Sequence, residues 1–123
     1  MLAVGTQAPD LELYSTPDQK IKLSALRGRK VILAFCPADW SPVCCDEMSL
    51  LNATRKLFDR HQAPLLGISV DSTWRHLAFS QSCQLHFPLL ADFESKGKGA
   101  RRYGVYDAPA GLNPGPDGIL AAF

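Results

Sequence analysis

Two uninterrupted apolar runs dominate the hydrophobic pattern of the chain. Residues 30–36 read KVILAFC and residues 65–70 read LLGISV, and neither run alternates with polar positions. Runs of this kind, partly β-branched, are typical of strands that are buried on both faces of a sheet. We therefore predict a central strand over residues 30–36 and a second buried strand over residues 65–70.

The segment between these two runs, residues 44–61, has helical periodicity. A helix that connects two buried strands favours a parallel pair, because the crossover returns the chain to the same end of the sheet. The predicted apolar stripe of this helix consists of Met48, Leu51, Leu57 and Phe58.

Residues 73–84 predict a second helix. Ser72 precedes this segment and suits the N-cap, because its hydroxyl can accept a hydrogen bond from a backbone N–H of the first turn. The expected apolar side of the helix consists of Trp74, Leu77 and Ala78.

Shorter segments complete the predicted sheet. Residues 11–14 alternate like an edge strand, and residues 21–23 repeat the pattern after a turn. Residues 87–92 form a short extended segment, and a third helix is expected over residues 95–103. Together these elements predict the α/β class, with helices over a mixed sheet.

The length and composition of the chain fit a single domain, which we expect to span residues 1–123. Apolar residues make up 46% of the chain and charged residues 20%, as in ordinary globular proteins. Residues 108–123 are rich in proline and glycine and have little periodicity, so we expect an irregular or truncated C-terminal part.

The small net charge of the chain argues against partners that are attracted by a long-range electrostatic field. The formal net charge is only +1, so neither nucleic acid nor a membrane is an expected partner. The N-terminus has no basic start followed by an apolar stretch, and no apolar run approaches the roughly 20 residues that span a bilayer. We therefore expect a cytoplasmic location. The four cysteines, two of them adjacent, then indicate reactive, metal-binding or simply buried thiols.

The strongest candidate for chemistry is Cys44, which opens the predicted helix after a loop that contains Pro37 and Pro42. Unpaired backbone N–H groups and the helix dipole favour an anion at a helix start, and a thiolate is an anion. The two prolines preset the shape of the loop. The Ser41 hydroxyl could donate a hydrogen bond to the thiolate or cap the helix. The alternative is that Cys44 is a small buried residue, as most free cysteines are.

A helix start does not by itself ionise a thiol at neutral pH. Lowering a cysteine pKa of about 8.5 by two and a half units takes roughly 3.4 kcal/mol, whereas an exposed helix terminus supplies about 0.3 to 1 kcal/mol. A cation, or several aimed donors, should therefore also face Cys44. The spacing of the sequence does not identify that group.

Several stretches of the chain share a family pattern. They are residues 5–13 (GTQAPDLEL), 20–35 (KIKLSALRGRKVILAF), the spacing of Pro37, Ser41 and Cys44 with Glu47 beyond it, 67–72 (GISVDS), 76–79 (HLAF), 87–92 (FPLLAD) and 103–106 (YGVY). In this order they resemble the peroxiredoxins of the AhpC/TSA superfamily, of the bacterioferritin-comigratory-protein and thiol-peroxidase types. The likeness covers about residues 4 to 107 and implies a thioredoxin-like fold.

The resemblance implies a thiol-dependent peroxidase. Cys44 would be the peroxidatic cysteine, which attacks hydrogen peroxide or an organic hydroperoxide and becomes a sulfenic acid. Pro37 would shield the sulfur and Ser41 would hydrogen-bond the peroxide. The implied enzyme has no cofactor, is regenerated by thioredoxin or a similar dithiol, and often forms a homodimer.

The chain departs from the family pattern near its C-terminal end. The family carries there a strand whose arginine contacts the thiolate, whereas residues 108–116 read APAGLNPGP, with no arginine and no apolar strand. The family's final helix is also missing from the sequence. Arg101 and Arg102 are the nearest candidates to replace the arginine, although the third predicted helix would leave them solvated.

A second thiol must resolve the sulfenic acid as a disulfide. Cys83 is the tentative choice, since some members of the family carry their resolving cysteine on this helix, although it could simply pack against Phe79. Cys45 is interpreted as a spectator, because its Cα lies about 3.8 Å from that of Cys44 and helical geometry turns the two side chains apart. Cys36 is expected to be buried.

No metal site is expected. His61, His76 and His86 share no ligand spacing with one another or with the cysteines. His76 and His86 are interpreted as surface or core-edge residues rather than catalysts.

Two other functions compete with the peroxidase. A thiol-disulfide oxidoreductase of thioredoxin-like type would carry Trp-Cys-x-x-Cys, but residues 40–44 read WSPVC, with serine in place of the attacking cysteine. A catalytically impaired or regulatory relative is the second alternative, and it is motivated by the missing arginine strand.

Overall fold

The computed structural model describes residue 5, residues 7–36 and residues 38–93. The predicted third helix, the irregular C-terminal part, Arg101 and Arg102 lie outside the described residues. The elements, in chain order, are β1 (Glu12–Thr16), β2 (Gln19–Lys22), the short 3-10 helix η1 (Leu23–Leu26), β3 (Ile32–Phe35), α1 (Pro42–Arg60), β4 (Leu65–Ser69), α2 (Thr73–Ser82) and β5 (Leu89–Ala91).

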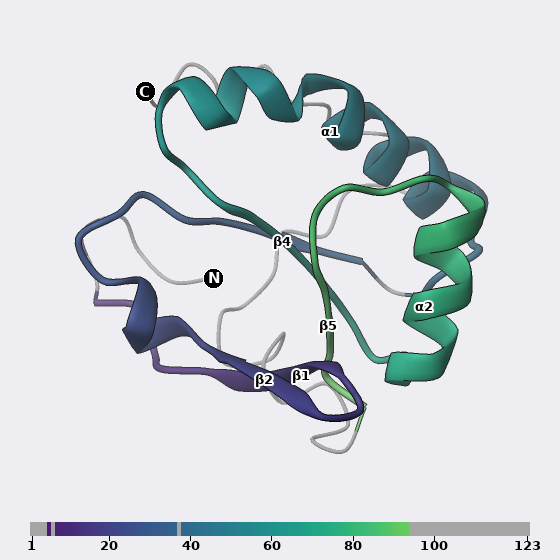
Figure 1. Cartoon of the computed structure of the whole chain (residues 1–123), viewed down its shortest axis with the longest axis horizontal. Helices are drawn as coiled ribbons and strands as arrows, with labels where there is room; N and C mark the ends of the chain where they lie inside the picture. Colours follow the sequence, from purple (N-terminus) through teal and green to yellow (C-terminus); the bar gives the residue numbers. More distant parts are fainter. Residues whose placement is uncertain (1–4, 6, 37, 94–123) are drawn as a thin grey trace.

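The strands form one mixed sheet in the order β2-β1-β5-β4-β3 (Figure 1). β3, β4 and β5 are parallel, β1 and β2 form an antiparallel hairpin, and β1 joins antiparallel to β5. The predictions of an α/β class, a mixed sheet and a parallel pair across the first helix are therefore confirmed.

Two positions in the sheet differ from the prediction. Within the described part of the chain, β3 ends the strand order instead of lying at its centre, and β2 rather than β1 is at the opposite edge. The error has a physical source: an apolar run reports how deeply a strand is buried, and not where the strand lies in its sheet. β4 does match the prediction, since all five of its residues are buried.

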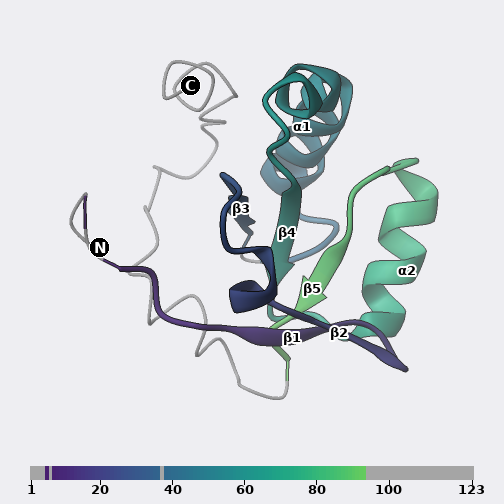
Figure 2. The ribbon, with the colours of Figure 1, turned by 60° about the vertical axis from the view of Figure 1, so that its left-hand side comes forward.

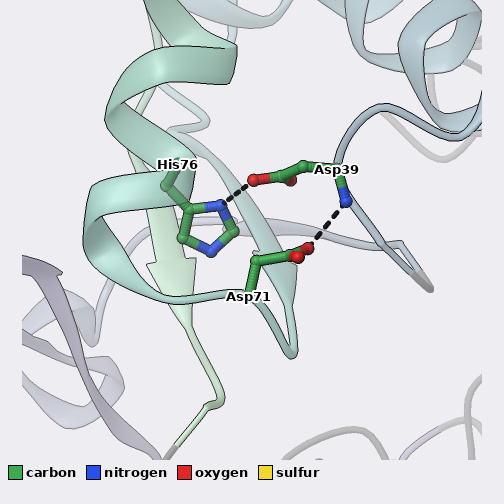
Figure 3. Close-up of side chains that lie close together, drawn as sticks. All are labelled: Asp39, Asp71 and His76. Carbon is green, nitrogen blue, oxygen red and sulfur yellow. Dashed lines mark hydrogen bonds and ion pairs between the residues drawn. The ribbon is translucent and has the colours of Figure 1, made fainter.

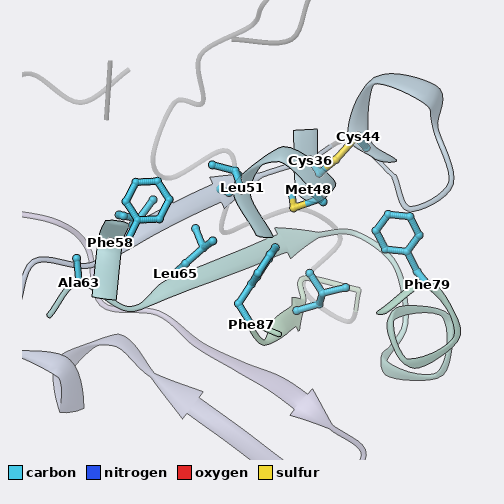
Figure 4. Close-up of a cluster of buried hydrophobic side chains, with 12 residues drawn as sticks. Cys36, Cys44, Met48, Leu51, Phe58, Ala63, Leu65, Phe79 and Phe87 are labelled. Atoms are coloured by element: carbon cyan, nitrogen blue, oxygen red, sulfur yellow. A yellow bond between two sulfur atoms is a disulfide. The ribbon is translucent and has the colours of Figure 1, made fainter. Parts of the chain in front are cut away.

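α1 and α2 pack on the same face of the sheet (Figure 2). The register aligns Ile32 with Leu65 and Gly67 with Leu89, so alternate residues of β3, β4 and β5 face these helices. Figure 4 shows the resulting cluster, to which α1 contributes Met48, Leu51 and Phe58 and α2 contributes Phe79.

The opposite face of the sheet carries a second, smaller cluster. The intervening residues of the same strands, Leu66, Ile68 and Leu90, pack there with Leu11 and Leu13 from the N-terminal hairpin. Partly buried side chains from η1 and β3 pack against this cluster. The alternation of the strands thus separates two apolar surfaces, and only the first one contains cysteines.

Both predicted helices are present near the predicted residues, but the buried face of α2 differs from the prediction. α1 begins at Pro42, two residues before the predicted start, and three of its four predicted stripe residues are buried, whereas Leu57 is exposed. In α2, Ser72 accepts the expected hydrogen bond from the N–H of Arg75. Neither of these described helices is long and apolar enough to cross a membrane.

The predicted apolar side of α2 is wrong. Trp74, Leu77 and Ala78 are exposed, and the buried residues are His76 and Phe79. The helix is rotated in this way because His76 finds polar partners inside the protein, in the loop before α1 and in β5.

Substitution of Leu51 tests the packing of α1 against the sheet. The Leu51 side chain is 2% exposed, and that of its neighbour Leu50 is 38% exposed. Leu51→Ala should lower the free energy of unfolding by about 2–5 kcal/mol, because it leaves a cavity in the cluster. The matched control Leu50→Ala should change it by about 0.5 kcal/mol or less. Equal losses in urea unfolding would contradict the orientation of the helix.

Candidate active site

Cys44 lies in the first turn of α1, as the sequence predicted, and is the third residue of the helix. Its sulfur is bonded to that of Cys36 in a disulfide, with 6.0 Å between the two Cα atoms. Cys36 follows β3 directly, and its N–H donates to the carbonyl of Ile68 at 2.8 Å. Cys44 is 1% exposed and Cys36 is 9% exposed, so the disulfide is buried (Figure 4).

The prediction that Cys36 is buried is confirmed, but its bond to Cys44 was missed. The two cysteines are eight residues apart. One short loop separates the strand end from the helix start, but the spacing of the two cysteines does not by itself predict that their sulfurs meet.

The predicted cap by the Ser41 hydroxyl is absent, and its predicted donation to a thiolate or a peroxide stays a prediction, because Cys44 is bonded to Cys36. Ser41 is the N-cap residue of α1, yet its side chain does not cap the helix. Its Oγ donates to the carbonyl of Ala38 at 3.1 Å, and its own carbonyl accepts the N–H of Cys45. Pro37 lies outside the described residues.

Trp40 holds the middle of the same loop in an uncommon backbone conformation. Its φ of 70° is in the left-handed region, which bulky residues seldom adopt. The indole ring packs edge-on against Phe79 of α2, with 5.4 Å between ring centroids. Contacts around the loop must compensate for this backbone cost.

The main polar contact of the loop is a buried pair, Asp39 and His76 (Figure 3). The Asp39 Oδ2 atom lies 2.7 Å from Nδ1 of His76, and both side chains are buried. The other ring nitrogen, Nε2, lies 3.1 Å from the carbonyl oxygen of Leu90 in β5. One imidazole therefore connects the loop, α2 and the sheet.

The hydrogen-bond partners of His76 determine where the protons of the Asp39–His76 pair lie. The carbonyl of Leu90 can only accept, so Nε2 of His76 carries a proton. A second proton must lie between Nδ1 and the Asp39 carboxyl, on one atom or the other. The pair is thus either an imidazolium with a carboxylate or a neutral imidazole with a carboxylic acid.

Asp71 holds the backbone of the loop from the other side. Its Oδ2 accepts the N–H of Asp39 at 2.7 Å (Figure 3). The same atom accepts the hydroxyl of Ser69 at 2.7 Å. Its Oδ1 pairs with Nε of Arg75 at 2.9 Å. The interpretation of His76 as a surface or core-edge residue is therefore wrong, because it belongs to a buried polar network.

A sequence signal for this network existed. Asp39 and Asp71 each follow a parallel strand, and the carboxyl ends of parallel strands meet at one edge of a sheet. His76 joins them within one turn of the N-terminus of α2. The ligand-type atoms of the three side chains lie within 4.8 Å of one another, which is close enough for a metal ion. Both imidazole nitrogens are already engaged by protein partners, so we interpret the trio as a hydrogen-bonded network.

The remaining two cysteines also lie together. Sγ of Cys45 is 3.5 Å from Sγ of Cys83, and both thiols are partly exposed. Burial, the hydrogen bond to Cys45, the charge of Cys45 and the charge of Asp39 raise the pKa of Cys83 to about 11. The interpretation of Cys45 as a spectator missed this contact between the two helices.

Glu47 is the acidic residue three positions after Cys44. It lies in α1 and is partly buried. Burial raises the pKa of its carboxyl above the ordinary value, because the charged form loses solvation.

Comparison with known proteins gives this arrangement a family context. A family model described as the AhpC/TSA family matches residues 4–119. Peroxiredoxin Bcp of Bacillus subtilis is 35% identical over 95 residues, which cover 77% of this chain and 60% of that protein. Alkyl hydroperoxide reductase E of Mycobacterium tuberculosis is 34% identical over 113 residues, which cover 91% of this chain and 74% of that protein.

Solved structures agree with the thioredoxin-like fold that the sequence implied. The crystal structure of peroxidoxin BcpB from Mycobacterium tuberculosis superimposes with a TM-score of 0.74 at 30% sequence identity. The match covers 87% of this chain and 69% of that one. The chain therefore spans only part of its relatives, and 60% of the Bacillus subtilis protein.

Removal of His76 tests the polar network. His76→Ala should lower the free energy of unfolding by about 3–5 kcal/mol, because it leaves the Asp39 carboxyl buried without its partner. The double variant Asp39→Ala/His76→Ala should lose about 0.5–3 kcal/mol less than the sum of the single losses in urea unfolding. Arg75→Ala, on the same helix, removes only a partly solvated ion pair and should cost about 1 kcal/mol or less. Strict additivity would contradict the contact.

The raised pKa of Glu47 predicts a pH-dependent stability. A carboxyl whose pKa is higher in the folded state stabilises the fold when it is protonated, and this contribution is lost as the pH rises through the folded value. Glu47→Gln should therefore raise the free energy of unfolding at pH 7, and the gain should disappear at a pH well below the ordinary value of 4.5. Urea unfolding at both pH values measures this. A gain of the same size at acidic pH would show that burial of the charged carboxylate is not its cause.

Proposed function

Because the chain belongs to the AhpC/TSA family and is similar to Bcp peroxiredoxins, we propose that it is a thiol-dependent peroxidase that reduces hydrogen peroxide or organic hydroperoxides. The observation that carries the proposal is the Cys36–Cys44 disulfide at the first turn of α1. A disulfide at this position is the product that a peroxide-oxidised cysteine leaves when a second thiol resolves it.

The first step is attack by Cys44. Its thiolate attacks one peroxide oxygen, the O–O bond breaks, and water or an alcohol leaves after taking up a proton. Cys44 is then a sulfenic acid. The helix start supports the anion with about 0.3 to 1 kcal/mol, so the remaining stabilisation of the thiolate must come from other groups near the loop.

Resolution is the second step, and we assign it to Cys36. The Cys36 thiolate attacks the sulfenic sulfur, the S–S bond forms, and the sulfenic oxygen leaves as water. Cys83, the resolving cysteine expected from the sequence, is supported less well, because its sulfur contacts Cys45. Cys44 of α1 is therefore paired with Cys36, whereas Cys83 of α2 contacts Cys45.

The loop residues and partners complete the proposal. The resemblance assigns to Pro37 the shielding of the sulfur. Ser41 hydrogen-bonds the peroxide after its hydroxyl turns away from the carbonyl of Ala38. A dithiol protein of the thioredoxin kind reduces the disulfide and regenerates both thiols. A homodimer and a cytoplasmic location are further parts of this proposal and rest on the resemblance and on the sequence.

Rapid mixing of the reduced chain with peroxide tests the function. The wild-type protein should lose two thiols for each peroxide within seconds, and Cys44→Ser should lose none on this timescale, because the attacking sulfur is gone. Thiol titration after quenching, with mass spectrometry of the products, measures both. A wild-type chain that keeps its thiols for minutes in excess peroxide would contradict the proposal.

The choice of resolving cysteine has its own test. In Cys36→Ser, peroxide should leave Cys44 as a sulfenic acid that a carbon nucleophile such as dimedone traps. In the matched variant Cys83→Ser, the Cys36–Cys44 disulfide should form as in the wild type. The opposite result, with trapping in Cys83→Ser alone, would move the role to Cys83.

A further inference from the structure

Two thiols outside the proposed peroxidatic pair meet between α1 and α2. Cys45 follows Cys44 in the first turns of α1, and Cys83 is the C-cap residue of α2. Their sulfurs are 3.5 Å apart, and closing to the roughly 2.05 Å of a disulfide needs a movement of about 1.5 Å. Cys36 and Cys44 are bonded to each other, whereas Cys45 and Cys83 are free thiols.

The segment after Cys83 is held against α1 by a polar clamp. Asn52, two turns after Cys45 on the same helix, donates from Nδ2 to the carbonyl of Gln84 at 3.0 Å. Its Oδ1 accepts the N–H of His86 at 2.8 Å. The end of α2 is therefore fixed beside α1, and the contact between the sulfurs does not depend on a loose loop.

All four sulfurs lie around the same apolar cluster, but they differ in access. Cys36 and Cys44 are part of the cluster, whereas Cys45 and Cys83 pack against its margin and are partly exposed. Thiol-disulfide exchange requires the attacking sulfur to reach the disulfide. A protein-sized dithiol can reach the margin more easily than a disulfide whose sulfurs are almost fully covered.

We propose that Cys45 and Cys83 form a second redox-active pair, which transfers electrons from an external protein dithiol to the buried Cys36–Cys44 disulfide. This role rests on the proposed peroxidase function, because that function generates the buried disulfide. The existence of the second pair rests on its own geometry.

The transfer proceeds by two exchanges. The Cys45 thiolate attacks the Cys36 sulfur, the Cys36–Cys44 bond breaks, and Cys44 leaves as a thiolate. The Cys83 sulfur then attacks Cys45, closes the Cys45–Cys83 disulfide and releases Cys36. The two protons given up by Cys45 and Cys83 appear on Cys36 and Cys44, and the external dithiol then reduces the new disulfide while it is itself oxidised.

The order of attack follows from the local chemistry. Attack on Cys36 avoids a bond between the adjacent residues Cys44 and Cys45, whose Cα atoms are only about 3.8 Å apart, below the usual disulfide range. We assign the first attack to Cys45, which adjoins Cys44 in the first turn of α1, and the raised pKa of Cys83 disfavours its own thiolate at neutral pH. The Cys83 S–H can donate to the Cys45 thiolate across the 3.5 Å contact.

The first test concerns the second pair alone and does not involve peroxide. In the full chain with Cys36→Ser and Cys44→Ser, equilibration with reduced and oxidised dithiothreitol should close an intramolecular Cys45–Cys83 disulfide, detected by thiol count and peptide mass spectrometry. The same chain with Cys83→Ser added is the control and should form none. Two free thiols at every dithiothreitol ratio would overturn the proposal.

The second test concerns the transfer. Wild type, Cys83→Ser and the control Ser82→Ala are oxidised with diamide and then reduced by thioredoxin or by a small phosphine, and peptide mass spectrometry follows the loss of the Cys36–Cys44 disulfide itself. Thioredoxin should reduce Cys83→Ser at least about tenfold more slowly than the other two, because access governs exchange. The phosphine should reduce all three chains at similar rates, since the buried bond itself is unchanged.

The outcomes separate this proposal from the peroxidase. Equal thioredoxin rates in Cys83→Ser and wild type would overturn the transfer whether or not peroxide oxidises the chain. Conversely, failure of peroxide to oxidise Cys44 would contradict the proposed peroxidase function, but the rates measured after diamide oxidation would still test the electron transfer.

Discussion

The buried contact between Asp39 and His76 is the interaction on which the arrangement around Cys44 depends. The loop between β3 and α1 has an unfavourable conformation at Trp40, and it is held by contacts from elements that come later in the chain. His76 of α2 makes one of these contacts, to Asp39, and its other ring nitrogen bonds the carbonyl of Leu90 in β5. Since α1 starts directly after this loop, the position of Cys44 follows from a histidine 32 residues away in sequence.

The same contact explains the orientation of α2. A buried polar pair stabilises a fold only when its partners stay in place, and breaking it leaves an unpaired group in an apolar interior. α2 therefore turns His76 and Phe79 inward, although Trp74 and Leu77 are the more apolar choice by composition. Cys83 lies at the C-terminal end of the same helix.

The sheet then places the thiols. Alternation along the strands assigns one face to α1 and α2, and the cluster on that face contains Cys36 and Cys44 and borders Cys45 and Cys83. Burial and the neighbouring charges of Cys45 and Asp39 raise the pKa of Cys83, so the chemistry at this surface depends on groups from three elements. The covered disulfide and the partly exposed dithiol differ in access because they lie at different depths of one cluster.

The sequence by itself determined the α/β class, the parallel pair across α1, the Ser72 cap and the position of Cys44 at a helix start, because each depends on local periodicity or on one neighbouring turn. It also carried the family pattern, which the comparisons confirm. The strand order, the inward face of α2, the Asp39–His76 pair and the pairing of the four cysteines were decided only by the tertiary structure. Cys45 and Cys83 are 38 residues apart. Local spacing does not encode such contacts, because they arise where separate elements pack against one another, and there the pairing of buried polar groups outweighs the hydrophobic pattern of a single helix.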